Sequence, residues 1–509
     1  MNTLVVLLLL FPAAGAILSG LLRKKASDLA ALVAVGLMLI VAAAIIGGVF
    51  PGTERSVTIR VPWLVKFRAE GEERPMAVEA GPAGTVPRLG HEPVPLFGYL
   101  LDPLGMLMLT VVSVLGFLVI VYALDYIGKG NKEHPSREGK ERHHFWMLLF
   151  VTSMIGVAIS PNLLQLYIFW ELTTLTSYAL ISHYRNDESL RAGFKALLMT
   201  YSGGVFFAIA IVTIFVKTGT FDFNALDQLS PGLRSLLFVA FLIAAWAKSA
   251  QVPFYTWLPD AMAAPTTVSM YLHAAAMVKA GVFLIARIST ATQQLSMGSG
   301  LLLGIMAVVT MLVGVYLFFF QDDLKRLLAF STITHLSYIL LGLSFGIMGS
   351  RAGMLGGIMH IMNHGVGKGL LFLCVGAISY VAGTRSIREL SGLAKRAPLI
   401  GVAFLVGMFA ILGVPPFSGF WSKFFLIMGA VDVGGAAGYL LLVPFVLEII
   451  IAFAWFLRVG QKVFFGTPSP AAEGAKNPPA AMSFSLVVLM VLCVIAPFVA
   501  LAFAHQIGF

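Results

Sequence analysis

The chain has 509 residues, of which 59% are hydrophobic and only 11% charged, a composition typical of a polytopic membrane protein without a large soluble domain. Its net charge of +10 would favour a nucleic-acid partner in a soluble protein, but the positive-inside rule explains these bases, so we expect no nucleic-acid binding. The two cysteines lie far apart in apolar runs, so we expect no cofactor, no metal and no disulfide framework.

About fourteen membrane-spanning helices are predicted when roughly 20 apolar residues are taken as one span. In chain order they cover residues 2–22, 27–50, 98–126, 145–160, 162–183, 194–216, 235–252, 266–289, 298–320, 326–347, 352–382, 398–430, 437–460 and 481–505. The predicted fold class is therefore an all-α polytopic membrane protein. The first span lacks a basic region ahead of its apolar stretch, so we expect it to be retained.

The charges between the spans predict the orientation of the chain. Twenty loop Lys and Arg fall on one side of the alternating spans and ten on the other, while four lysines lie inside spans. The positive-inside rule then places both termini outside the cytoplasm, in a cell inner membrane. The long polar segment 51–95 contains an alternating stretch at 56–61 and is expected to form an external hairpin and loop.

Two spans are interrupted by proline. The seventh continues through Pro253, and the twelfth contains Pro415 and Pro416. Each should break and expose carbonyls and helix ends at depth. Because the two spans are five apart, they should run in opposite directions, which predicts two inverted five-helix repeats, each with a broken helix. The domains are then 1–126 (helices 1–3 and the external loop), 127–290 (first repeat), 291–465 (second repeat) and 466–509 (C-terminal loop and helix).

Five charged residues lie deep in the predicted spans: Glu171, Lys248, Lys279, Lys368 and Lys423. A charge at the bilayer centre costs at least about 2.5–3.5 kcal/mol, so such residues usually serve a function, and a desolvated lysine readily gives up its proton. Glu171 must be protonated or paired, and Lys248 beside a proline break is the partner that we choose, with a static packing salt bridge as the alternative. For Lys279 the alternative is snorkelling toward a helix end.

The eleventh span carries His360, His364 and Lys368 at a spacing of four and four. This spacing places two imidazoles and an amine along one face over about 12 Å of helix, which suits a row of proton-accepting groups joined by water. Metal binding by the two histidines and core packing are alternatives. No carboxylate or third ligand accompanies the histidines within this span, which disfavours the metal.

Three further polar residues lie in or beside the apolar spans. His335 in the tenth span could bridge toward Lys279, and taken alone it is equally a packing residue. Glu448 in the thirteenth span has three interpretations: a partner of Lys423, an exit group for ions, or a neutral carboxyl that is hydrogen-bonded in the core. Asp102, near the start of the third span, is expected to cap or anchor that helix.

With these residues in place, the chain resembles the antiporter-like membrane subunits shared by respiratory complex I, Mrp cation/proton antiporters and membrane-bound hydrogenase-type complexes. The stretches that carry the resemblance are 101–104, 168–172, 248–262, 272–281, 323–332 and 360–368. Their residues are most similar to the N-terminal part of the large Mrp subunit. The chain lacks both the lateral helix of the L-type subunit of complex I and the extra C-terminal helices of the large Mrp subunit, so we expect a stand-alone homologue docked to similar subunits.

The resemblance implies a role for each buried residue. Glu171 and Lys248 would form a coupling pair, and Lys423 would open toward the outside. The middle of the membrane would hold an axis of Lys279, His335, His360, His364 and Lys368. The implied function is translocation of H⁺, with or without Na⁺/H⁺ antiport, in a multisubunit respiratory, hydrogenase-type or Mrp complex. The chain itself would hold no redox centre, although the parent complex would be a redox-driven oxidoreductase in the first two cases. The alternative function is a non-pumping scaffold subunit.

Overall fold

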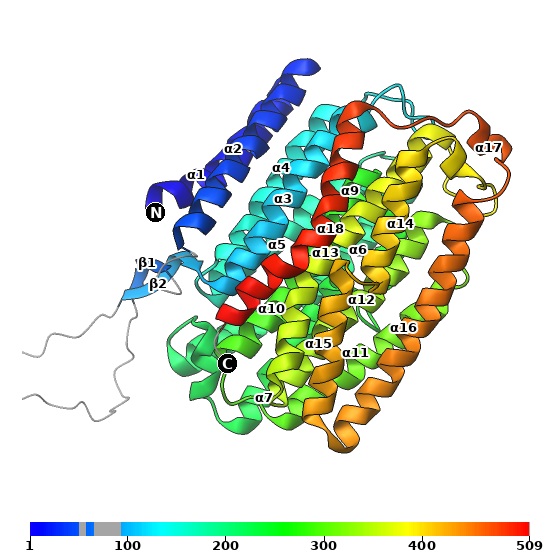
Figure 1. Cartoon of the computed structure of the whole chain (residues 1–509). Helices are drawn as coiled ribbons and strands as arrows, with labels where there is room; N and C mark the ends of the chain where they lie inside the picture. The colour runs from blue at the N-terminus through cyan, green and yellow to red at the C-terminus, as the bar shows by residue number, and fades with distance from the viewer. Residues whose placement is uncertain (50–56, 66–92, 508–509) are drawn as a thin grey trace, which may run out of the picture.

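The computed structural model describes residues 1–49, 57–65 and 93–507, which form a bundle of long helices with one small β-hairpin at its side (Figure 1). Within these ranges, twelve helices are long and apolar enough to cross a membrane. The predicted all-α polytopic class is confirmed. The count of fourteen spans stays a prediction, although each predicted range overlaps at least one helix.

The described residues form the following helices and strands, in chain order. Those of the first half are α1 (Asn2–Leu21), α2 (Lys25–Val49), β1 (Val57–Val65), β2 (Pro93–Leu101), α3 (Pro103–Tyr126), α4 (Lys140–Ile159), α5 (Leu163–Ile181), α6 (Asp187–Thr218), η1 (Phe223–Gln228), α7 (Pro231–Lys248), α8 (Trp257–Asp260), η2 (Ala261–Ala263), α9 (Thr266–Ala274) and α10 (Met277–Ala291). Those of the second half are α11 (Met297–Phe318), α12 (Leu324–Ile347), α13 (Arg351–Ala382), η3 (Leu393–Lys395), α14 (Pro398–Leu412), α15 (Ser418–Val433), α16 (Gly435–Phe464), α17 (Pro470–Glu473) and α18 (Ala480–Gln506).

A β-hairpin precedes α3. Strand β1 pairs antiparallel with β2, with Val57 opposite Leu101, so the strand predicted near 56–61 is confirmed. The third predicted span begins too early, because residues 98–101 belong to β2 and α3 starts only at Pro103. The Asp102 side chain accepts a hydrogen bond from the Gly105 amide at 2.9 Å, which with proline at the first helical position gives a strong helix start. Most of the predicted external loop, residues 66–92, lies outside the described residues.

Both predicted helix breaks are confirmed. Helix α7 ends at Lys248, and only short helical turns precede α9, which starts at Thr266, while α14 and α15 are separated by residues 413–417 around Pro415. A third break, which the sequence did not predict, lies at 275–276 between α9 and α10, inside the predicted span 266–289. The amides of both residues there bond to the Tyr271 carbonyl, at 3.1 and 2.9 Å. Residues 275 and 276 are fully buried, so this break exposes helix ends inside the bundle and not at its surface.

Helix α13 is the centre of the bundle. It packs against α12, α15, α18, α9 and α14, and nearly all of its length is buried. Glycines let the backbones approach closely, since a Cβ at Gly342 of α12 would lie 2.5 Å from the Gly357 Cα of α13. The segment with His360 and Lys368 is therefore held in the middle of the molecule (Figure 1).

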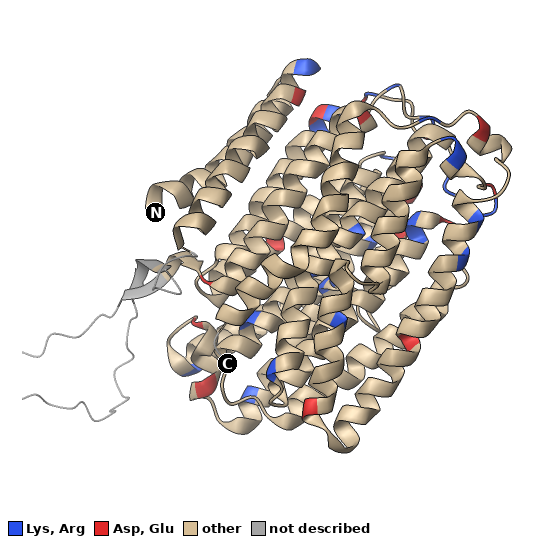
Figure 2. Ribbon diagram, in the orientation of Figure 1, with Lys and Arg blue, Asp and Glu red and all other residues tan. Residues whose placement is uncertain are grey.

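Charged residues also occur inside the bundle, and Figure 2 shows Lys and Arg both on the loops at its upper end and among the helices. Three bases that the sequence analysis assigned to loops are in fact buried: Arg234, Arg287 and Lys325. Arg234 donates to backbone carbonyls, among them that of Gln294 at 2.8 Å. The loop charge count therefore overestimates the exposed bases, while the asymmetry itself remains, because only three bases change class.

The ion pair between Asp102 and Arg287 predicts a stability effect. Arg287 of α10 is 3% exposed, and its guanidinium donates to both carboxylate oxygens of Asp102, with 2.9 Å from Nη2 to Oδ1. Asp102→Asn keeps a cap acceptor but leaves a buried guanidinium unpaired, so we expect a loss of about 3 kcal/mol in the free energy of unfolding. Asp102→Ala should lose roughly 1 kcal/mol more with the cap. Thermal unfolding in detergent should rank wild type, Asn and Ala in that order, and an Asn variant that melts with wild type contradicts the expectation.

Candidate functional site

The four deep lysines lie on four different helices, α7, α10, α13 and α15, and all are buried. In the described part of the chain none of them forms an ion pair. Each amine instead donates to a neutral oxygen: Lys248 to the Trp170 carbonyl (2.9 Å), Lys279 to the Ile361 carbonyl (2.8 Å), Lys368 to the Ser331 hydroxyl (2.7 Å) and Lys423 to the Leu412 carbonyl (3.0 Å). A lysine held only by neutral dipoles can lose its proton without leaving a carboxylate unpaired.

Glu171 and Lys248 meet on one turn of α5. The Lys248 amine donates to the Trp170 carbonyl and to the Thr174 hydroxyl, which stand on either side of Glu171 in the sequence. The carboxylate lies outside ion-pair distance, and its Oε1 is buried without a hydrogen-bond partner among the described residues. Gly204 of α6 leaves room for this oxygen, because a Cβ there would clash with it. The two side chains are thus electrostatic neighbours without a direct salt bridge.

Three buried histidines gather between α12 and α13. His335 Nδ1 and His360 Nε2 lie 3.1 Å apart, and His360 Nδ1 lies 2.8 Å from the Ser422 hydroxyl of α15. The His364 ring centre is 5.6 Å from that of His335 and 6.0 Å from that of His360. Neutral imidazole has one donor and one acceptor nitrogen, so the hydrogen-bonded rings of His335 and His360 can pass a proton between them. Both ring nitrogens of His364 are buried without a hydrogen-bond partner among the described residues.

Hydrogen bonds hold three of the deep lysines close to this histidine cluster, which consists of His335, His360 and His364, although none of them bonds to a histidine ring among the described residues. Next to Lys248, the Ser249 hydroxyl donates to the Val278 carbonyl at 2.8 Å, directly before Lys279 in the chain. Lys279 then bonds to the carbonyl of residue 361, which follows His360. Lys368 bonds to the hydroxyl of residue 331, one helical turn before His335. The predicted axis residues are therefore neighbours in space as well as in pattern.

The far end of this row lies at the second broken helix. Lys423 bonds to the last carbonyl of α14 and lies 5.3 Å from the ring centre of Tyr338. The Tyr338 hydroxyl donates to Glu448 of α16, and its ring is 4.6 Å from that of His335. Glu448 forms no ion pair with Lys423 in the described structure, so its contact fits the hydrogen-bonded carboxyl among the three interpretations. Tyr338 was not predicted from the sequence, although its position three residues after His335 places both on one helix face.

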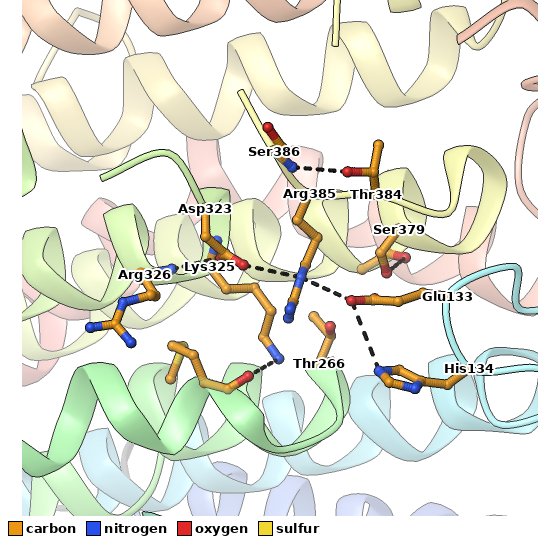
Figure 3. Close-up of polar contacts among 12 residues, drawn as sticks. Glu133, His134, Thr266, Asp323, Lys325, Arg326, Ser379, Thr384, Arg385 and Ser386 are labelled. Atoms are coloured by element: carbon orange, nitrogen blue, oxygen red, sulfur yellow. Dashed lines mark hydrogen bonds and ion pairs between the residues drawn. The ribbon is translucent and has the colours of Figure 1, made fainter. Parts of the chain in front are cut away.

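A second polar cluster, also missed, lies where the connections before α4, α9 and α12 meet (Figure 3). Lys325 of α12 is 1% exposed and donates to two carbonyls in the segment between α8 and α9, at 2.9 and 2.6 Å. Arg385 lies between Glu133 and Asp323, 3.0 and 3.3 Å from their carboxylates. Lys325 thus holds the carbonyls of the first broken segment. The residue sits in the first turn of a helix, where the sequence does not separate an exposed lysine from a buried one.

This fold and the buried row of amines and imidazoles define a polytopic membrane protein with titratable groups at bilayer depth. Residues 160–451 match the family described as "NADH:quinone oxidoreductase/Mrp antiporter, TM", and residues 95–135 match "NADH-Ubiquinone oxidoreductase (complex I), chain 5 N-terminus". The chain belongs to the NADH:quinone oxidoreductase/Mrp antiporter family. This confirms the resemblance predicted from its motifs.

Curated relatives include components of cation antiporters. The A1 component of a Na⁺/H⁺ antiporter from Staphylococcus epidermidis is 34% identical over 378 residues, covering 70% of this chain and 46% of that protein. The A component of the Na⁺/H⁺ antiporter from Alkalihalophilus pseudofirmus is 34% identical over 439 residues, covering 81% and 53%. The A/B component of a K⁺/H⁺ antiporter from Rhizobium meliloti, named as a probable one, is 36% identical over 423 residues, covering 81% and 40%. The chain thus spans about half the length of these relatives.

Two solved structures share the fold. A chain of the Mrp complex from Dietzia sp. DQ12-45-1b superimposes with a TM-score of 0.82 at 28% identity, covering 99% of this chain and 52% of that one. A chain of the membrane-bound sulfane sulfur reductase, an archaeal respiratory membrane complex, superimposes with a TM-score of 0.79 at 20% identity, covering 96% and 75%. The second likeness concerns the fold alone.

Proposed function

We propose that the chain is an ion-translocating membrane subunit of a multisubunit complex, moving H⁺ and, where antiport is coupled, Na⁺. The observation that carries the proposal is the row of buried lysines and histidines between two broken helices, in which each lysine is held by neutral oxygens. Family membership and the Na⁺/H⁺ antiporter names of relatives support it. Ion flux in proteoliposomes containing the assembled complex tests it, and flux that survives loss of the buried lysines would leave only a scaffold role.

The proposed coupling step is electrostatic and begins at Glu171 and Lys248. When the carboxylate approaches the amine, the ammonium form is stabilised, and when it withdraws, the buried charge is disfavoured. The proton of Lys248 is then driven along the axis of Lys279, the histidine cluster and Lys368, and onward to Lys423. The carboxylate needs only a side-chain movement, since the amine already rests on the same turn of α5.

The partners that we propose are other membrane subunits of an Mrp or respiratory-type complex, including similar antiporter-like subunits. The names of the antiporter relatives and of the two solved complexes support this assignment. Where the parent complex transfers electrons, we propose that other subunits carry them. The two halves from α4 to α10 and from α11 to α16 would be inverted repeats, each with a helix broken beside a buried lysine.

The proposed location is the cell inner membrane with both termini outside the cytoplasm, so the loop containing Lys132 should face the cytoplasm. Both native cysteines are buried, so a single introduced cysteine can be labelled selectively. In sealed right-side-out vesicles, an impermeant thiol reagent should label Gln293→Cys, between α10 and α11, and spare Lys132→Cys. Labelling of both positions would contradict the alternation of spans.

A further inference from the structure

A basic cavity lies at the end of the bundle where α4 begins and α5 ends. It has a volume of about 480 Å³, and its lining includes Arg142, Arg185, His134, His183 and Glu138. Two guanidiniums therefore line one cavity with a single acid, which is exposed. This cavity is separate from the lysine and histidine row, none of whose members lines it.

The cavity carries an excess of positive charge, because two guanidiniums face one carboxylate. Arg142 Nη2 donates to the backbone carbonyl of His183 at 2.5 Å, and neither Arg142 nor Arg185 forms an ion pair in the described part of the chain. Burial, with the charges of Arg142 and Arg185, lowers the pKa of the His183 imidazole to about 4. The ring is therefore neutral at pH 7, and the cavity's charge comes from the two guanidiniums.

An apolar groove continues from this cavity toward the membrane-facing side. It has a volume of about 510 Å³ and runs between the last turns of α1 and the first turns of α4, lined by Ile17, Gly20, Leu21, Gly139, Glu141 and Phe145. The acid in this lining, Glu141, accepts a hydrogen bond from the Lys24 amide at 3.0 Å. Arg142 lines both the groove and the cavity. Ile17 and Leu21 are 57% and 76% exposed, so the groove opens to the surroundings of the helices. The absence of a side chain at Gly20 keeps the groove open, because a Cβ there would lie 3.2 Å from the Phe145 ring and would partly fill it.

We propose that this cavity and groove bind an anionic phospholipid, with its phosphate between Arg142 and Arg185 and an acyl chain between α1 and α4. Guanidinium groups bind phosphate oxygens through paired N–H donors, and basic residues at helix ends attract anionic lipid headgroups. The continuous apolar groove selects a lipid over a soluble anion, because a free phosphate would use the cavity alone. The site lies at the ends of membrane helices, at the level where headgroups lie.

Lipid binding to the purified, delipidated full chain tests this inference without any transport assay. We expect phosphatidylglycerol to bind and to raise the thermal unfolding temperature, whereas phosphatidylcholine and inorganic phosphate should have little effect. Arg142→Gln combined with Arg185→Gln should lower the affinity for phosphatidylglycerol roughly 30-fold, because each lost basic group should weaken binding about fivefold and the two effects multiply. The matched control is Lys395→Gln combined with Arg396→Gln, which removes two exposed bases elsewhere and should leave affinity unchanged.

Three results would overturn the inference: equal binding of phosphatidylglycerol and phosphatidylcholine, equal stabilisation by inorganic phosphate, or unchanged affinity in the double variant. Equal stabilisation by phosphate would indicate a soluble-anion site. If the double variant does not fold, Arg185→Gln alone decides, because it preserves the bond from Arg142 to the His183 carbonyl. That variant should bind about fivefold more weakly, and an unchanged affinity would overturn the site.

Discussion

Lys248→Ala is expected to abolish most ion translocation while the complex still assembles. The amine is fully buried on the turn of α5 that carries Glu171, and its loss leaves a carboxyl that can take up a proton and become neutral. Glu171→Gln should impair flux similarly. The double variant should be little worse than either single variant, as expected for residues that act as one unit. Complex yield and ion flux in proteoliposomes, measured for all three variants, give the comparison.

A scaffold role for this pair predicts another pattern. The single variants would then lose assembled complex, the double variant would recover part of it, and whatever complex survived would show normal flux. The structure already weighs against a static bridge, because the Lys248 amine binds a carbonyl and a hydroxyl rather than the Glu171 carboxylate. Recovery of yield in the double variant together with full flux would contradict the coupling role.

His360→Leu should cut ion flux by roughly 100-fold, the order of magnitude for removing a positioned proton-transfer group. This ring lies between His335 and Ser422, at 3.1 and 2.8 Å, and it is the direct polar link from α12 to the second broken helix. Flux per assembled complex is the readout, since the His335 nitrogen left without its partner also costs about 1–3 kcal/mol. The Ser422 hydroxyl keeps its bond to the Gly419 carbonyl at 3.3 Å. His505→Leu, at an exposed position of α18, is the control and should keep wild-type flux. Equal flux in the two variants would remove His360 from the pathway.

The helices and the two proline breaks could be predicted from the sequence, because burial of a long apolar run and loss of an amide donor are local effects. The deep lysines were identifiable because a charge within a long apolar run is costly whichever face of the helix carries it, so its presence indicates a function. The break at 275–276 was not, since both residues are alanines; beside the break α13 packs closely, and a Cβ at Gly365 of α13 would lie 2.9 Å from the Ala274 carbonyl. Local sequence carries no sign of that approach.

Residues near helix ends were the least predictable. Arg287 and Lys325 have the sequence context of exposed bases, yet each is buried because a distant segment supplies its partner, Asp102 for the first and the carbonyls before α9 for the second. Tyr338 had no charge to mark it, although its hydroxyl bonds to Glu448. These roles arise from tertiary contacts, and composition and spacing do not report them.

Ion flux per assembled complex carrying Lys423→Ala tests the translocation axis most directly. This amine bonds only to the Leu412 carbonyl and lies over the Tyr338 ring, without an ion-pair partner in the described structure. Its removal therefore leaves no buried acid unpaired, and assembly should be preserved. Flux in the Lys423→Ala complex should fall to background, because Lys423 stands at the opposite end of the row from Lys248. The control variant Lys395→Ala, at an exposed position, should keep wild-type flux. Normal flux in assembled Lys423→Ala complex would contradict the proposed function.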